Sequence, residues 1–456
     1  MDKIRLLQTR KQKIVDAGKQ IRKDINSLID ADSFVEFSVF SFSKNEFYGE
    51  EAEGEGVVTG FATIKGNPFY IVAQNAAVLS GGVSKANCEK IAKCLDQAEK
   101  SETPVIYLLS SLGVQMGEGV TVLEGLASLI LKASQLKGTV PQYLIVNGEA
   151  YGQIAMLAGL CDFTFFIDKK SALAVNSPLV ISAKSGVNID KLKSCGASGL
   201  DKANLASFTV SNIAEVKNTI IKINGLLSTP VIDAELNKSI PELDKRCDYK
   251  TLSKVFDKDS AVEVGVSYSP EVKCVLCRIG GIATAAVVFD GSEGVELTAG
   301  NVRKLKDFAE FACCYDLPYI TFVNTLGIKS DLATHNSLVV KELGEYVSIL
   351  DCITSAKISV VYGKAIGLGY TVFAAKSMGY DYSYAFANSK IALFDSVQGA
   401  EIEFANEKAD KVKLAEKYSE ENSDPVNAAK GGYIDNIIQP AFLKQYLIAS
   451  LQMLLK

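Results

Sequence analysis

Two kinds of hydrophobic pattern recur along the chain, one typical of buried strands and one typical of helices. Short β-branched and aromatic runs, PVIYLLSS at 104–111 and PYITFVNT at 318–325, predict buried strands, and each reaches a glycine two residues later. The stretches NCEKIAKCLDQAEK at 87–100 and NVRKLKDFAEFAC at 301–313 have apolar residues at helical spacing. Because strands and helices alternate, the pattern predicts an α/β fold with mainly parallel strand pairing.

The same order of elements occurs twice along the chain. The block TPVIYLLSSLG at 103–113 matches LPYITFVNTLG at 317–327. GEAYG at 148–152 matches GKAIG at 363–367, and IKG at 64–66 matches IGG at 279–281, at nearly the same spacing. Since several blocks keep one spacing and one order, we interpret the chain as a tandem duplication.

The duplication divides the chain into two predicted domains, residues 1–232 and 233–456. A polar segment at about 227–270 is the predicted linker. Residues 1–30 are expected to form an amphipathic helix in front of the first domain, and residues 441–456 a terminal helix with an apolar stripe.

Glycine turns suggest where the chemistry lies. In each copy two predicted strands run into a glycine followed by a helix, at Gly113 and Gly152 and again at Gly327 and Gly367. Such turns leave backbone N–H groups unpaired at the positive end of a helix. Two converging turns would form an oxyanion hole, which stabilises an enolate or a tetrahedral oxyanion without a titrating side chain.

Composition narrows the class of protein. The 456 residues are 48% hydrophobic and 22% charged, enough for more than one core. A net charge of −5 argues against a nucleic-acid partner, which requires a basic face. Without a long apolar run or a signal-peptide core, the chain is expected to be cytoplasmic, with any membrane contact made through a partner subunit.

Cysteine and histidine usage argues against metal or triad chemistry. Of ten cysteines, Cys274 and Cys277 form one CxxC, but they lie in a strand-like run that points them to opposite faces. We expect reduced thiols and no metal. His335 is the one histidine and lies in a polar loop, so a Ser-His-Asp triad is not expected.

Four segments carry distinctive motifs: GVVTGFATIKGNPFYIVAQ at 56–74, VLSGG at 78–82, RIGGIA at 278–283 and KAIGLGY at 364–370. They resemble motifs of the carboxyltransferase family of biotin-dependent acyl-CoA carboxylases and decarboxylases, and the resemblance covers nearly the whole chain. The first segment resembles the opening of that family's first half, the second its glycine-rich loop, and the last two its ARIGGRP and KAYGGAY. The family includes the propionyl-CoA carboxylase β subunits and the methylmalonyl-CoA decarboxylase α subunits.

The resemblance implies two crotonase-like domains, each a ββα superhelix. It places an acyl-CoA thioester in the N-terminal half and biotin in the C-terminal half, with a site between opposite halves of two subunits. The biotin would arrive on a separate biotin carboxyl carrier protein. Further implied partners are a biotin carboxylase or a membrane decarboxylase subunit, and a second copy of the chain in a homo-oligomer, a dimer-based hexamer.

The resemblance also implies site residues. The candidate oxyanion donors are the amides of Gly113, Val114, Gly152, Gln153, Gly327, Ile328, Gly367 and Leu368. The candidate residues for binding CoA or biotin are Gly81, Gly82, Lys90, Lys93 and Tyr370.

The glycine motifs depart from the family. DSGGAR-x-x-EG becomes SSLGVQMGEG at 110–119, and G-x-x-AGG becomes GEAYGQ at 148–153. PGF becomes LGI at 326–328, and GGAY becomes GLGY at 367–370. Amide donors survive such replacements, but added side chains restrict the backbone and narrow the pocket.

Two alternatives to an active carboxyltransferase follow. One is a non-catalytic paralogue that acts as an acyl-CoA-binding scaffold of a biotin-enzyme complex. The other is a crotonase-type hydratase or thioesterase, which would need a carboxylate near the hole, and only Glu118 and Glu149 are placed to supply one.

Overall fold

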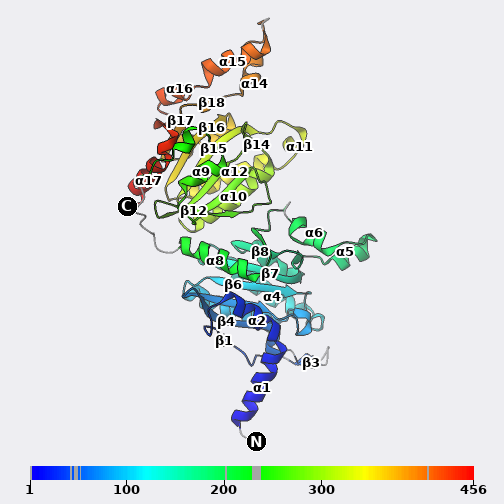
Figure 1. Ribbon diagram of the computed structural model, residues 1–456. Coiled ribbons are helices and arrows are strands. Elements are labelled where there is room, and N and C mark those ends of the chain that lie inside the picture. The colour runs from blue at the N-terminus through cyan, green and yellow to red at the C-terminus, as the bar shows by residue number, and fades with distance from the viewer. Residues whose placement is uncertain are drawn as a thin grey trace. The chain divides into compact units, whose positions relative to one another are not determined.

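The computed structural model describes residues 3–41, 44–45, 50–51, 53–200, 203–227, 238–407 and 410–455. The chain divides into two compact units, Met1–Ile221 and Lys222–Lys456. Each unit contains its own mixed sheet flanked by helices (Figure 1). The domain boundary expected from the sequence, between residues 232 and 233, lies within 228–237, outside the described residues.

The sheet of the first unit is antiparallel at one side and parallel across the rest. Along its path lie β1 (Val35–Phe37), β4 (Val57–Ile64), β5 (Asn67–Gln74), β6 (Val105–Ser111), β7 (Gln142–Tyr151), β8 (Phe163–Ile167) and β10 (Phe208–Val210). Pairing is antiparallel from β1 to β5 and parallel from β5 to β10. A short strand, β9 (Ala172–Ala174), pairs with β7, and β2 (Lys44–Asn45) pairs with β3 (Glu50–Glu51).

Eight helices among the described residues accompany this sheet. They are α1 (Lys3–Ala17), α2 (Lys19–Leu28), α3 (Lys85–Lys100), α4 (Val120–Leu136), α5 (Pro178–Ser185), α6 (Lys191–Cys195), α7 (Ala197–Leu200) and α8 (Ile213–Leu227), the last of which contains the division between the units. Apolar residues of α3 and α4, such as Ile91 and Leu129, are buried against strand residues such as Tyr107 and Leu144. The 3.6-residue apolar spacing of these helices thus provides the core of the unit.

The second unit repeats this plan. Its strand order is β11 (Val262–Val264), β12 (Val272–Ile279), β13 (Ile282–Phe289), β15 (Tyr319–Ile328), β16 (Lys357–Ile366), β17 (Tyr382–Phe386) and β19 (Asn436–Ile438), with β14 (Val295–Leu297) on β15 and β18 (Lys390–Ala392) on β16. Its helices are α9 (Tyr249–Leu252), α10 (Ala299–Cys314), α11 (Leu332–His335), α12 (Val339–Cys352), α13 (Leu368–Phe373), α14 (Ser396–Glu403), α15 (Lys411–Asn422), α16 (Pro425–Lys430) and α17 (Leu443–Leu454).

Strand registers agree between the units at the spacing found in the sequence. The β4–β5 hairpin pairs Ile64 with Asn67, and the β12–β13 hairpin pairs Ile279 with Ile282 at the equivalent position of the second copy. Both hairpin turns need positive φ, supplied by Lys65 and Gly66 in one and by Gly280 and Gly281 in the other. The recurring IKG and IGG blocks are therefore tight hairpin turns.

Two expectations about the ends of the domains were wrong in detail. The N-terminal amphipathic segment is two helices, α1 and α2, separated at Gly18. The expected linker is largely folded into the second unit, because Leu243, Leu252 and Val255 are buried in its core and β11 pairs with β12. Polar residues of the segment, such as Lys245 and Lys258, are exposed. None of the helices in the described part of the chain has the length and apolar character that a bilayer-spanning helix requires.

Candidate functional site

The first glycine turn of unit 1 directly follows β6. Gly113 has a φ of 127°, a backbone conformation that favours glycine, and a Cβ added there would meet no atom within 4 Å. Its N–H donates to Ser111 Oγ at 3.3 Å, and its carbonyl accepts from the N–H of Val83 at 2.9 Å. Both the N–H and the carbonyl of Gly113 therefore hold the turn in place through hydrogen bonds.

The next residue, Val114, presents a free amide. The carbonyl of Val83 accepts from the N–H of Gln115 at 2.8 Å, so Val83 bonds to the residues on either side of Val114. In this parallel bridge the N–H of Val114 points away from Val83. It has no hydrogen-bond partner among the residues that the structure describes.

The second turn of unit 1 lies against the first. Gly152, with a φ of 89°, ends β7, and its N–H donates to the carbonyl of Ala174 at 3.1 Å. A 3-10 helix, Gln153–Gly159, starts there, and the N–H of Gln153 in its first turn has no acceptor within the described ranges. A Cβ on Gly152 would lie 3.5 Å from the Cα of Gly113, so the two turns converge.

Unit 2 repeats this geometry. Gly327, with a φ of 87°, donates its N–H to Thr325 Oγ1 at 3.0 Å, and Gly367, with a φ of 50°, donates to the carbonyl of Ala392 at 2.9 Å. A Cβ on Gly327 would lie 3.1 Å from the carbonyl oxygen of Ile366, which precedes Gly367. These two turns therefore also meet.

In unit 2, as in unit 1, the amides to consider are those of the residues that follow the two glycines. Leu368 opens α13, and its N–H has no acceptor in the described part of the chain. Ile328 pairs with Leu297 in β14, whose carbonyl accepts from Lys329 at 2.9 Å. By the parallel pattern, the N–H of Ile328 points away from β14.

The candidate donors thus fall into two groups. The N–H groups of Gly113, Gly152, Gly327 and Gly367 already have acceptors within the chain, so these glycines shape the turns through positive φ. The amides of the following residues, Val114, Gln153 and Leu368, have no acceptor in the described part of the chain, and the N–H of Ile328 points away from β14.

Sequence reasoning missed two hydroxyl groups that set these turns. Ser111 and Thr325, at equivalent positions of the two copies, each accept the N–H of the glycine two positions later. The repeated pattern of a hydroxyl residue, leucine and glycine was the signal that could have identified them. Because each hydroxyl occupies the glycine amide, it leaves the next amide as the donor of the turn.

The glycine-rich loop, Gly81 and Gly82, packs against the end of β6, which leads into the first turn. Gly81 and Gly82 are buried, and a Cβ on Gly81 would lie 2.3 Å from the carbonyl oxygen of Ser110 at the end of β6. The loop therefore needs glycine for close backbone packing. This burial argues against the expected direct contact of Gly81 and Gly82 with a bound cofactor.

Lys90 is also a structural residue. It is 3% exposed, and its ammonium donates to the carbonyls of Gly54 at 2.9 Å and Val57 at 2.7 Å. Burial lowers the pKa of Lys90 to about 8. Its counterpart Lys304 makes the same kind of contact in unit 2, so Lys90 is not available to CoA, whereas Lys93 is exposed on α3.

Tyr370 lies one turn beyond Gly367 and is half-buried. Its hydroxyl donates to the carbonyl of Tyr433 at 3.4 Å, and burial raises the pKa of the phenol. The side chain therefore remains neutral beside the second turn of unit 2 and presents a polar edge there.

The carboxylates considered for hydratase or thioesterase chemistry have other partners. Glu118 accepts the N–H of Lys85 at 2.7 Å, at the N-terminus of α3, and Glu149 is paired with Lys191. His335 is exposed at the end of α11. Within the described ranges, no group of three or more His, Cys, Asp or Glu is arranged to hold a metal ion.

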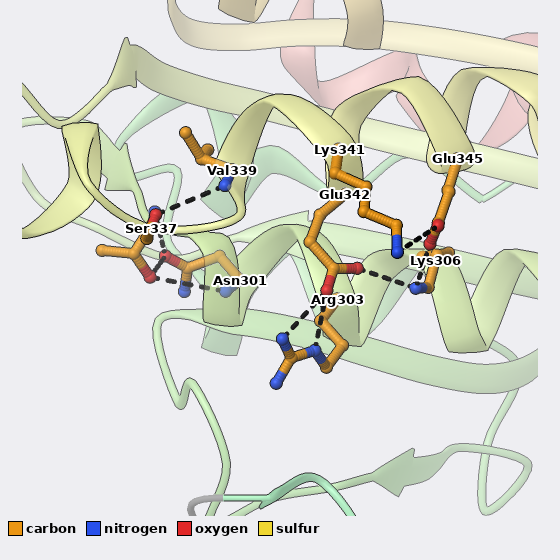
Figure 2. Close-up of polar contacts among 9 residues, drawn as sticks. Asn301, Arg303, Lys306, Ser337, Val339, Lys341, Glu342 and Glu345 are labelled. Atoms are coloured by element: carbon orange, nitrogen blue, oxygen red, sulfur yellow. Dashed lines mark hydrogen bonds and ion pairs between the residues drawn. The ribbon is translucent and has the colours of Figure 1, made fainter.

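Helix α12, which follows the Gly327 turn, is fixed to α10 by a cluster of charges (Figure 2). Glu342, with a side chain that is 6% exposed, accepts from Arg303 at 2.9 Å and from Lys306 at 2.7 Å. Lys306 also contacts Glu345 at 2.7 Å. The helices on either side of β15 in the sequence are thereby tied to each other.

Duplicated mixed sheets with converging glycine turns define a two-domain α/β protein, and backbone amides at such turns are suited to binding an oxyanion. The model of the family described as "Carboxyl transferase domain" matches residues 15–456. The chain therefore belongs to the carboxyl transferase family, as its motifs predicted.

The relatives are subunits of acyl-CoA carboxylases and decarboxylases. The propionyl-CoA carboxylase beta chain of Cereibacter sphaeroides is 27% identical over 92% of this chain and 87% of its own length. The methylmalonyl-CoA decarboxylase subunit alpha of Veillonella parvula is 26% identical over 94% of this chain and 88% of its own. The expected carboxyltransferase class, with CoA thioesters as the substrates of its relatives, is confirmed.

The fold is shared with a solved enzyme. The crystal structure of transcarboxylase 12S, with methylmalonyl-coenzyme A and methylmalonic acid bound, superimposes with a TM-score of 0.91. It covers 99% of this chain and 95% of the other at 23% identity. The predicted tandem crotonase-like fold is confirmed by this match.

Proposed function

We propose that the chain moves a carboxyl group between carboxybiotin, carried on a separate carrier protein, and the α-carbon of a short acyl-CoA. The observation that supports this reaction is the pair of converging glycine turns in each unit. The amides of Val114, Gln153 and Leu368 have no acceptor among the described residues, and the amide of Ile328 points away from β14. Carboxyl transfer creates negative charge on an oxygen of each reactant, and N–H groups held in place stabilise such charge.

In this proposal the acyl-CoA thioester binds unit 1. The open space beside Gly113, where a Cβ would meet nothing within 4 Å, admits a carbonyl oxygen next to the Val114 amide. Lys93 is exposed on α3 and can face the CoA phosphates. Since the donors are amides, binding of the thioester is independent of metal.

Biotin binds unit 2 in the same proposal. Carboxybiotin supplies the carboxyl group, and the ureido oxygen faces the amides of Ile328 and Leu368. Tyr370 borders this turn with a neutral hydroxyl.

The two halves act together in a homo-oligomer, a dimer-based hexamer, which receives the biotin carboxyl carrier protein and a biotin carboxylase or membrane decarboxylase subunit. The transcarboxylase 12S structure, described as a hexamer assembly, supports the oligomer. We place the assembly in the cytoplasm.

The variant Gly367→Val tests the biotin site. A Cβ at Gly367 would lie 3.0 Å from the carbonyl oxygen of Leu393, and φ is positive, so valine must displace the Leu368 amide. Carboxyl exchange between biotin or the carrier and acyl-CoAs should fall about 100-fold or more. Affinity for CoA esters, measured by calorimetry, should remain.

The matched control is Gly344→Val, an exposed glycine of α12 where a Cβ would meet no atom within 4 Å. It should keep the parental exchange rate. A folded Gly367→Val protein that transfers at the parental rate would disprove the biotin-site assignment.

A scaffold function is the second candidate. Side chains stand where the family motifs have glycine, at Leu112, Gln153 and Leu368, and this favours it. If the unaltered protein, with its own carrier, transfers nothing to or from acetyl-, propionyl-, malonyl-, methylmalonyl- or glutaconyl-CoA, the scaffold function replaces the transferase.

A further inference from the structure

The N-terminal half of α1 projects from unit 1 without contributing to its core. Every residue from Lys3 to Lys13 is exposed, and Ile14 is the first buried residue of the helix. Figure 1 shows α1 extending away from the sheet of its unit. We call residues 3–13 the basic tip. The family match begins at residue 15, so the basic tip lies outside the matched region.

The basic tip carries concentrated positive charge. Its basic residues are Lys3, Arg5, Arg10, Lys11 and Lys13, and it contains no acidic residue, since the nearest ones along the chain are Asp2 and Asp16. Lys13 pairs with Glu53 at 2.5 Å, while the other four have no ion pair with the described residues. The whole chain has a net charge of −5, so this patch opposes the charge of the body.

The projection separates the two charges. Eleven helical residues extend about 16 Å at the usual helical rise. This exceeds the Debye length of about 8 Å at physiological ionic strength. The acidic body therefore does not cancel the attraction of the tip to an anionic surface.

The same tip exposes large apolar side chains. Ile4, Leu6 and Leu7 are 64%, 49% and 53% exposed. Apolar side chains next to lysine and arginine on a helix are typical of segments that lie at a lipid interface. Lys11, on the same face as Ile4 and Leu7, can extend its ammonium towards head groups while its methylene stem stays with them.

The placement of charge on the helix favours a lipid surface over a protein groove. Successive residues are about 100° apart, so Lys3, Arg10 and Lys11 lie on the same side of the helix as Ile4 and Leu7. A planar anionic layer can meet these cations and apolar side chains together, whereas the core of a protein interface is depleted in lysine. We propose that the basic tip docks on an anionic lipid surface, a property beyond the proposed transferase function.

Vesicle co-sedimentation of the full chain tests the proposal. Wild-type protein should bind equimolar phosphatidylglycerol–phosphatidylcholine vesicles, and binding should weaken in high salt and be absent on phosphatidylcholine alone. The variant Arg5→Gln/Arg10→Gln/Lys11→Gln should bind about 100-fold more weakly, since each cation near the surface contributes to the attraction. Circular dichroism verifies that it is folded.

The control variant removes the same charge elsewhere. Lys411→Gln/Lys413→Gln/Lys417→Gln changes three exposed lysines of α15 and should bind vesicles as the wild type does. Failure of the wild type to bind the mixed vesicles, or equal binding by the tip variant, would overturn the proposal. A change in oligomer mass by light scattering, with vesicle binding unaltered, would assign the tip to a protein interface instead.

Discussion

At the residue scale, single carboxylates hold the hairpins that open both sheets. Asp30 accepts the amides of Lys65 and Gly66, each at 2.9 Å, and these bonds lower the pKa of the carboxyl. Asp257 accepts the amides of Gly280 at 3.2 Å and Gly281 at 2.7 Å, and also Lys444 at 2.7 Å. Each unit therefore places a carboxylate against the positive-φ turn.

Asp257→Ala should destabilise the protein by about 3 kcal/mol, because it leaves Lys444 charged and unpaired. The two side chains are only 10% and 11% exposed. The free energy of unfolding from urea titration measures the loss. The double variant Asp257→Ala/Lys444→Met should recover part of it, and additive losses would refute a coupled pair.

At the element scale, the contact between α10 and α12 depends on charge as well as apolar packing. Burial favours the neutral form of Glu342, but hydrogen bonds from Lys306 and Arg303 outweigh it and lower the pKa of its carboxyl. The corresponding helices α3 and α4 use the reverse arrangement, with Lys132 between Asp96 and Glu99. Duplicated helix pairs thus keep their packing with different ion pairs.

Glu342→Gln should cost about 2 kcal/mol of unfolding free energy at neutral pH, since two cations lose their shared partner. A lowered folded-state pKa stabilises the protein above the ordinary value of 4.5, and this contribution is lost as pH falls through the folded pKa. The difference between variant and wild type should therefore shrink in acid. Glu345→Gln, 42% exposed, is the control and should cost under about 1 kcal/mol. A deficit that is independent of pH would contradict the ionic origin.

At the scale of the whole molecule, buried thiols are distributed over both units. Burial raises the pKa of Cys94 in unit 1 and of Cys274 in unit 2 to about 12, from 9.0. The unfolded chain loses these protons first, so the folded state gains stability from them below pH 9 and loses it as pH rises towards 12.

Unfolding free energy should therefore fall above pH 9 by about 1.4 kcal/mol per pH unit for each such thiol. Urea titrations at several alkaline pH values measure the slope. Cys94→Ala should flatten it, whereas Cys352→Ala, at an exposed position, should leave it unchanged. Equal slopes in all three proteins would show that buried thiols do not control alkaline stability.

The sequence by itself determined the duplication, the α/β class, the carboxyl transferase family and the four glycine turns. These follow from local patterns, because strand and helix periods and positive-φ turns depend on neighbouring residues. The spacing between the equivalent sequence blocks of the two copies is also the spacing between their equivalent hairpins, β4–β5 and β12–β13.

Only the tertiary structure decided which groups are available to a ligand. Lys90 was a candidate for binding CoA or biotin, but carbonyls from distant residues accept from its ammonium. The four glycine amides appeared free, but Ser111, Thr325, Ala174 and Ala392 accept their hydrogens. Burial and hydrogen-bond satisfaction depend on contacts between residues far apart in the chain, which no local pattern encodes.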